Sequence, residues 1–181
     1  ASGLFGRGLG RSFLLIALLS CSTILPAQTR VANEYQVKAV FLFNFTQFVE
    51  WPSSAFASSQ APLVIGVLGE NPFGSYLENV VSGEKVNGHK LEVHYYKNSE
   101  EIKTCHILFI SKDKINEMPT VLTTLNGKNI LTVSDVSRFL HQGGMVRFFI
   151  KNNKINFQIN LDAAKAAKLD VSSKLLRLAE I

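Results

Sequence analysis

The sequence predicts an α/β fold of three layers, in which helices flank a mainly parallel sheet and a C-terminal antiparallel β-hairpin closes that sheet. Three observations lead to this prediction. One long amphipathic segment opens the domain, unbroken apolar runs then alternate with helical segments, and two alternating runs joined by a tight turn come near the end. Strands that alternate with helices imply right-handed crossovers between parallel strands.

The first 27 residues have the features of a secretory signal. Arg7 and Arg11 precede an apolar run over residues 13–24, and Leu25-Pro26-Ala27 offers a small residue for cleavage. The run is too short to cross a bilayer comfortably, which favours a cleaved leader over a membrane anchor. We therefore expect residues 1–27 to be a signal peptide.

Residues 28–181 are then expected to form one domain in the periplasm. An alternative stays open, in which the signal belongs to a lipoprotein and Cys21 is lipidated, although Leu19 stands where that motif usually has a small residue. Removal of the leader takes away two arginines and no acidic residue, so the net charge falls from +5 to +3. This mild charge comes without an arginine-rich run, and we expect no nucleic-acid partner.

Cysteine, histidine and motif content argue against catalysis and metal binding. Only Cys105 remains in the mature chain, and its apolar neighbours indicate a thiol buried at the start of a strand. His89, His94, His106 and His141 have no ligand spacing, so we expect no metal or cofactor. Nucleophile elbows, phosphate loops and paired catalytic carboxylates are not recognisable, which leaves an exported hydrolase as a remote third hypothesis.

The opening amphipathic segment predicts a helix from about Glu34 to Trp51, ended by Pro52. Asn33 and Gln36 form a capping-box pattern at its start. On a helical wheel the apolar arc and its flanks are expected to face the core, and they comprise Tyr35, Val40, Phe41, Leu42, Phe45, Phe48, Val49 and Trp51. The opposite face, expected in water, comprises Gln36, Thr46, Gln47 and Glu50.

Phe43 is the exception on this helix, because it falls on the polar face. Exposing a phenylalanine forgoes roughly 1.5 to 3 kcal/mol of burial, so something is expected to cover it. The cover is either a loop or C-terminal helix of the same chain, or a partner or second subunit. Asn44, in the apolar arc, is expected to be a buried amide bonded to backbone.

The middle of the chain predicts strands at residues 63–68, 91–96, 106–110 and 129–133, with the second at a wetter edge. Helices are expected after Asn71, as an N-cap, and from about Pro119 to Asn126. At the end, residues 146–150 and 155–159 flank an Asn152-Asn153 turn and form the hairpin. Asp162 is expected to cap a short helix, and Ser172 or Ser173 to cap the last one, residues 174–179.

A ligand crevice is the one pocket that this topology predicts. Parallel sheets bind ligands beyond the carboxyl ends of their strands. In this sequence those ends carry Gly69, Glu70, Asn71, Ser111, Ser134 and Asp135. The same residues also serve as ordinary caps and turns, so a small-molecule receptor remains an alternative function.

Four segments in order resemble the YfiR family of periplasmic proteins. They are YQVKAVFLFNFTQFVEWP (residues 35–52), IGVLGENPFG (65–74), CHILFIS (105–111) and the stretch over residues 143–179 with its Ser-Ser-Lys-Leu-Leu ending. The resemblance implies a protein that is not an enzyme and that represses an inner-membrane diguanylate cyclase by binding its periplasmic sensor region. Disulfides found in some members cannot form within this mature chain.

We expect the partner contact on the polar face of the hairpin and the segment that follows it, with a homodimer as a further option. The candidate residues are Phe43, Gln158, Asn160, Ser172, Ser173, Leu175 and Leu176. Capping is an equally good explanation for the serines, and core packing for the leucines.

Overall fold

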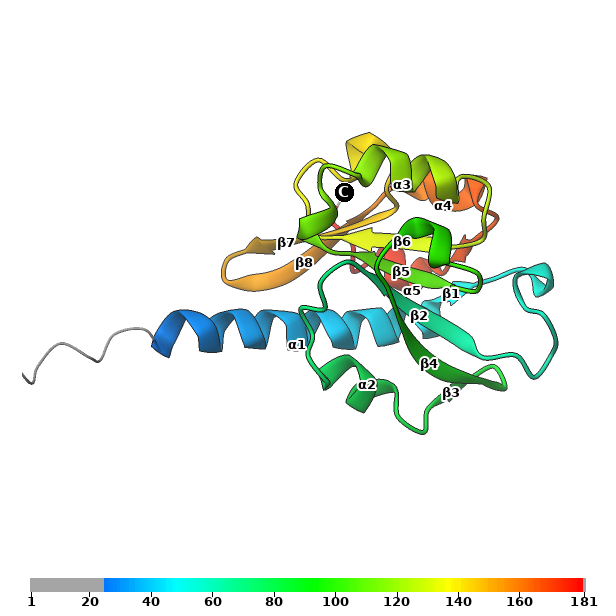
Figure 1. Ribbon diagram of the computed structural model, residues 1–181, viewed down its shortest axis with the longest axis horizontal. Helices are drawn as coiled ribbons and strands as arrows, with labels where there is room; N and C mark the ends of the chain where they lie inside the picture. The colour runs from blue at the N-terminus through cyan, green and yellow to red at the C-terminus, as the bar shows by residue number, and fades with distance from the viewer. Residues whose placement is uncertain (1–24, 181) are drawn as a thin grey trace, which may run out of the picture.

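The computed structural model describes residues 25–180, and these form a sheet of seven strands with helices on both faces (Figure 1). The strand order is β3-β4-β2-β5-β6-β7-β8, parallel from β4 through β7 and antiparallel at both edges. The seven strands of this sheet are β2 (Leu63–Leu68), β3 (Lys85–Val86), β4 (His89–Tyr96), β5 (Ile107–Ile110), β6 (Leu131–Ser134), β7 (Val146–Lys151) and β8 (Lys154–Ile159). A separate two-stranded sheet pairs β1 (Val49–Glu50) with β9 (Asp170–Val171). The predicted α/β class and closing hairpin are confirmed.

Five α-helices and four short 3₁₀ helices connect these strands. The α-helices are α1 (Leu25–Phe48), α2 (Tyr76–Val81), α3 (Met118–Leu125), α4 (Leu161–Ala166) and α5 (Ser173–Leu176). The 3₁₀ helices are η1 (Ser53–Ala55), η2 (Ser99–Glu101), η3 (Lys112–Lys114) and η4 (Leu140–Gln142). No helix in residues 25–180 is both long and apolar enough to cross a bilayer.

The bounds of α1 differ from the prediction at both ends. The helix is already formed at Leu25, so Asn33 lies inside it and the predicted capping box is wrong. Neither glycine nor proline occurs between Ala27 and Phe48, so nothing in the sequence stops the helix at Asn33. At its other end the chain leaves the helix after Phe48, because β1 pairs antiparallel with β9.

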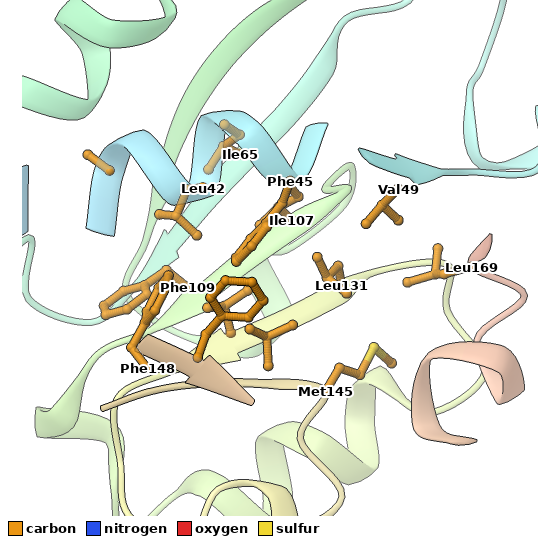
Figure 2. Packing of buried hydrophobic residues seen from close by; sticks show 14 of the residues in the cluster. Leu42, Phe45, Val49, Ile65, Ile107, Phe109, Leu131, Met145, Phe148 and Leu169 are labelled. Atoms are coloured by element: carbon orange, nitrogen blue, oxygen red, sulfur yellow. The ribbon is translucent and has the colours of Figure 1, made fainter. Parts of the chain in front are cut away.

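The buried face of α1 packs on the sheet through aromatic contacts. Leu42 and Phe45 are fully buried, and Figure 2 shows them pointing toward the core of the domain. The ring of Phe45 stacks on Phe148 of β7 at 5.9 Å and meets Phe157 of β8 edge-on at 5.4 Å. The first helix and the C-terminal hairpin therefore share one aromatic core.

The burial of three side chains on α1 tests the expectations made for them. Thr46 was expected in water but is 1% exposed, because its hydroxyl donates to the Phe43 carbonyl at 2.6 Å and needs no water. Phe43 is half-buried and packs against the main core of its own chain. Asn44 is half-buried rather than enclosed.

Side chains of the central strands point alternately to two separate cores. Ile107 and Phe109 of β5 join the larger core, which lies under α1 and α2. Leu108 and Ile110 join the smaller core, which includes Met118 of α3. Because both faces of the strands are covered, the apolar runs are unbroken, and the three-layer arrangement is confirmed.

Local caps account for most of the remaining differences. Asn160, and not Asp162, caps α4, since its side chain accepts from the Ala163 amide. Asn71 bonds within its own turn and α2 begins only at Tyr76, so the predicted N-cap is wrong. The predicted cap by Ser172 on α5 is confirmed.

Strand β4 was expected at an edge of the sheet, but the two-residue strand β3 lies outside it. In the sequence, Leu91, Val93 and Tyr95 alternate with Glu92, His94 and Tyr96, which predicts that Tyr95 faces the core and Tyr96 the wetter side. The structure shows the reverse at the end of β4, where Tyr95 is exposed and Tyr96 is buried. The hairpin turn agrees with its prediction, because Asn152 and Asn153 have φ of 51° and 58°, as a two-residue turn of type I′ requires.

Replacing Phe45 with alanine tests the shared aromatic core. We expect Phe45→Ala to lower the free energy of unfolding by about 4 kcal/mol, because a fully buried ring is lost and a cavity remains. The exposed Gln47 on the same helix supplies the control, and Gln47→Ala should change stability by less than about 0.5 kcal/mol. Urea denaturation gives both values, and equal losses in the two variants would contradict the packing described.

Candidate functional site

The structure brings the predicted crevice residues to one edge of the sheet. Strands β2, β5 and β6 are parallel neighbours, and Leu68, Ile110 and Ser134 pair in register at their carboxyl ends. The loops that follow these three strands therefore begin side by side.

Most polar groups at this edge bond to backbone atoms of the same strand end or of a neighbouring one. The Ser111 hydroxyl donates to the Glu70 carbonyl at 2.5 Å, and the Ser134 hydroxyl donates to the Ile110 carbonyl at 2.7 Å. The Asn71 side chain closes a turn by bonding Phe73 and Gly74. These groups hold the loops in place, and their hydrogen-bonding capacity is largely used.

Gly69 allows the first of these loops to pack against the second. Its φ is +93°, and a Cβ at this position would lie 2.5 Å from a carboxylate oxygen of Asp113. That same oxygen accepts from the Glu70 amide at 3.1 Å. Gly69 thus satisfies a structural requirement at the strand end.

Asp135 differs from its neighbours, because it is the centre of a buried charged network. Its side chain is 4% exposed, and its Oδ2 atom accepts from the Tyr35 hydroxyl at 2.9 Å and from the Lys38 ammonium. Lys38 also pairs with Glu34, one helical turn earlier on α1. Lys112, which is mostly exposed, lies 3.4 Å from the same Oδ2 atom.

Lys38 is the side chain on which this network depends. Its side chain is only 1% exposed, and its ammonium also lies 4.2 Å from the centre of the Tyr35 ring. A buried ammonium is tolerated only when it is paired, and two carboxylates and an aromatic face supply this pairing. Lys38 therefore fastens α1 to the loop that follows β6.

The network also holds Tyr35 in its neutral form. Burial raises the pKa of the Tyr35 hydroxyl, and the charge of Asp135, its hydrogen bond and the charge of Glu34 raise it further. Tyr35 consequently remains a hydrogen-bond donor to Asp135 at neutral pH. Asp135 Oδ1 is buried without a hydrogen-bond partner among the described residues.

Sequence reasoning missed Lys38, Tyr35, Glu34 and Lys112 as parts of this site. The spacing of Glu34 and Lys38 is the i, i+4 spacing of a helical ion pair, which was the available signal. Nothing local shows that Asp135, 97 residues away from Lys38, completes the network.

The predicted partner-contact residues lie on β8 and on the segment after it. Gln158 is half-buried and accepts from Arg147 at 2.9 Å, and it bridges to Glu180. Asn160 and Ser172 are half-buried helix caps, accepting from Ala163 and Leu175.

The remaining members of that set differ in exposure. Leu175 is buried in the main core, Leu176 is half-buried against it, and Ser173 is exposed. Phe43 is on α1, which contacts α5. Ser173 is thus the member of this set most accessible to another molecule.

Cys105 and His106 lie at the opposite end of the sheet and are both buried. The Cys105 thiol donates to the Ile107 carbonyl, and burial raises its pKa to about 12. His106 Nδ1 accepts from the Val64 amide at 3.0 Å, and its ring stacks on Phe56. Within residues 25–180 no cluster of three metal-ligating side chains occurs.

Taken as a class, the molecule is an α/β domain built on a seven-stranded sheet, and its buried polar groups serve its own architecture. A comparison with protein families matches residues 35–180 to the YfiR/HmsC-like family, and the chain belongs to that family. The resemblance seen in the sequence is thereby confirmed. Members of this family are periplasmic regulators rather than enzymes. Membership therefore supports, in general terms, a periplasmic regulator that acts in diguanylate cyclase signalling. No curated protein matches the chain.

Replacing Lys38 with methionine tests the charged network. Lys38→Met should lower the free energy of unfolding by about 3 to 5 kcal/mol, because the buried Asp135 carboxylate loses its buried cation and keeps only the mostly exposed Lys112. Adding Asp135→Asn should recover part of this loss. Lys112→Met is the matched control and should cost less than about 1 kcal/mol, since Lys112 is mostly exposed. Chemical denaturation of the wild type and of these three variants gives the values, and a harmless Lys38→Met would disprove the network's role.

The acid stability of the fold should depend on His106. Burial, with a smaller contribution from nearby His89, lowers the pKa of His106 from 6.5 to about 4. The unfolded chain therefore binds a proton there at a higher pH than the folded chain does. The stability contribution is complete above pH 6.5 and is lost as the pH falls toward 4, on the order of 2 to 3 kcal/mol.

Two histidine variants separate this effect from other acid titrations. His106→Asn keeps an acceptor for the Val64 amide and should flatten the loss of stability between pH 6.5 and 4. His141→Asn, at an exposed position, should keep the wild-type profile. Unfolding free energies measured across this range decide the matter, and parallel profiles for wild type and His106→Asn would contradict the assignment.

Proposed function

We propose that this protein is exported by its leader and represses an inner-membrane diguanylate cyclase by binding that enzyme's periplasmic sensor region. The family match over residues 35–180 is the observation that supports this function. Repression of this kind lowers cyclic-di-GMP without any reaction in the regulator itself. A binding preference of about 3 kcal/mol for the inactive sensor shifts its equilibrium more than a hundredfold.

The proposed contact surface comprises the outer side of β8 and the start of α5. Gln158 is half-buried and tied to Arg147, so it is held in a fixed orientation before any partner arrives. Ser173 is exposed directly after the cap of α5. Fixed polar groups beside half-buried Leu176 give a surface on which little side-chain freedom is lost when a partner binds.

Phe43 and Leu175 have a supporting part in this proposal. Both contribute to the main core, so they position the surface from beneath. A substitution at either residue would change stability together with binding, and neither is suitable for a clean test.

Ser173 offers that clean test. Ser173→Glu places a carboxylate in the first turn of α5, where helix N-termini accept negative charge, so the fold should be retained. We expect the variant to bind the purified sensor region at least tenfold more weakly. In cells that lack the gene, cyclic-di-GMP should rise, and Ser173→Glu should restore repression less well than the wild-type chain.

Thr120→Glu is the matched control, because it makes the same change in the first turn of α3. That helix packs in the smaller core on the other face of the sheet, so binding and repression should match wild type. If deletion of the gene left cyclic-di-GMP unchanged while the protein reached the periplasm, the proposed function would be wrong. Equal effects of the two glutamates would move the contact away from α5.

A further inference from the structure

A groove of about 530 Å³ lies between the N-terminal half of α1 and the tip of the hairpin formed by β7 and β8. Figure 1 shows the hairpin running beside this part of α1 before it turns back. The volume of the groove is in the range of small-molecule sites. The groove shares Glu34 with the strand-end network, and none of its other lining residues belongs to that network or to the contact surface proposed above.

The floor of the groove is apolar and open. Val37 of α1 is 45% exposed and Ile150 of β7 is 53% exposed, and both line it together with Phe41 and Ile155. The Phe41 ring packs against the buried ring of Phe157, with 5.4 Å between the ring centroids. An apolar body that entered from solvent would therefore cover side chains that are now in water.

Charge at the rim of the groove is unbalanced. Glu34, on the helix side, pairs with Lys38, which also pairs with Asp135, and Lys112 lies beside that aspartate. Two acids and two lysines leave no net charge on that side. Lys154, on the hairpin side, is exposed and finds no carboxylate partner within residues 25–180.

The neighbouring lysine of the hairpin does not share this property. Lys151 pairs with Glu180 at 2.8 Å, so its charge is already matched. Lys154 is therefore the cation at this groove that can receive an anion. Asn33, exposed at the opposite rim, adds an amide donor.

We propose that this groove binds a small amphiphilic anion, with its apolar body on Val37, Phe41, Ile150 and Ile155 and its carboxylate on Lys154. Floor and rim together match a hydrocarbon chain or ring that carries one negative group. A second copy of the chain fits less well, because Val37 and Ile150 are two isolated side chains and a stable dimer buries about 800 Å² on each subunit.

Two probes with the same alkyl chain and opposite head charges test this proposal. Decanoate and decyltrimethylammonium are titrated into the full mature protein below their micelle concentrations, and isothermal calorimetry measures binding. Wild type should bind decanoate saturably and at least tenfold more tightly than the cationic probe. Methyl NMR signals of Val37 and Ile150 should shift during the decanoate titration.

Lys154→Glu should reverse this preference, with decanoate weakened at least tenfold and the cationic probe strengthened. The matched control is Lys90→Glu, which makes the same charge change on β4, near the other edge of the sheet, and should leave both affinities as in wild type. Ile150→Thr keeps a strand-forming residue and should weaken both probes by removing apolar contact.

Several outcomes would overturn the proposal. These are no saturable decanoate binding, equal binding of the two probes, an equal loss in Lys90→Glu, or methyl shifts confined to residues outside the groove. Sedimentation that shows self-association blocked by Ile150→Thr, without decanoate binding, would assign the groove to a second copy. The proposal rests on the groove alone, so failure of cyclase repression would leave this test unaffected.

Discussion

The contact between α1 and the sheet is the interaction on which the rest of this structure depends. Phe45 links the first helix to both strands of the C-terminal hairpin, and β1 then pairs with β9 beyond the helix end. These contacts join the start of the chain to its end around the parallel strands. The fold is therefore closed by long-range contacts, and no local segment holds the larger core together by itself.

Lys38 gives this contact a fixed geometry that apolar packing alone does not supply. Side chains in a hydrophobic interface tolerate small rotations of a helix, whereas an enclosed ammonium must face its carboxylates. Glu34 lies on α1 itself and turns with the helix, so the pairing of Lys38 with Asp135, on the loop after β6, is the one that restrains the rotation of α1. Burying the Lys38 ammonium is costly, and the ion pair with Asp135 that offsets this cost also defines the position of α1.

Much of the fold could be predicted from the sequence, because its signals were local. Unbroken apolar runs marked β2 and β5, and Asn152-Asn153 marked the hairpin turn, since few other residues adopt positive φ. The helix start at Leu25 and the burial of Thr46 were not predictable in the same way. The first depends on the absence of a stop signal, and the second on a hydroxyl bonding to its own helix. At the strand ends the sequence indicated which residues meet, but not that Asp135 binds a lysine from α1.

The positions of the charged network and the groove have a consequence for regulation. Glu34 belongs to both, since it pairs with Lys38 and also lines the groove. An anion bound in the groove would therefore lie close to the residues that fix α1. Through Glu34, occupation of the groove would affect the packing of the helix that organises the core. The hairpin gives a second link, because Lys154 at its tip and Gln158 farther along belong to the same strand, β8. The proposed anion site at the tip and the proposed contact surface at the base are thus joined by one short, well-paired element, which is the kind of connection that lets a small ligand alter the binding of a larger partner.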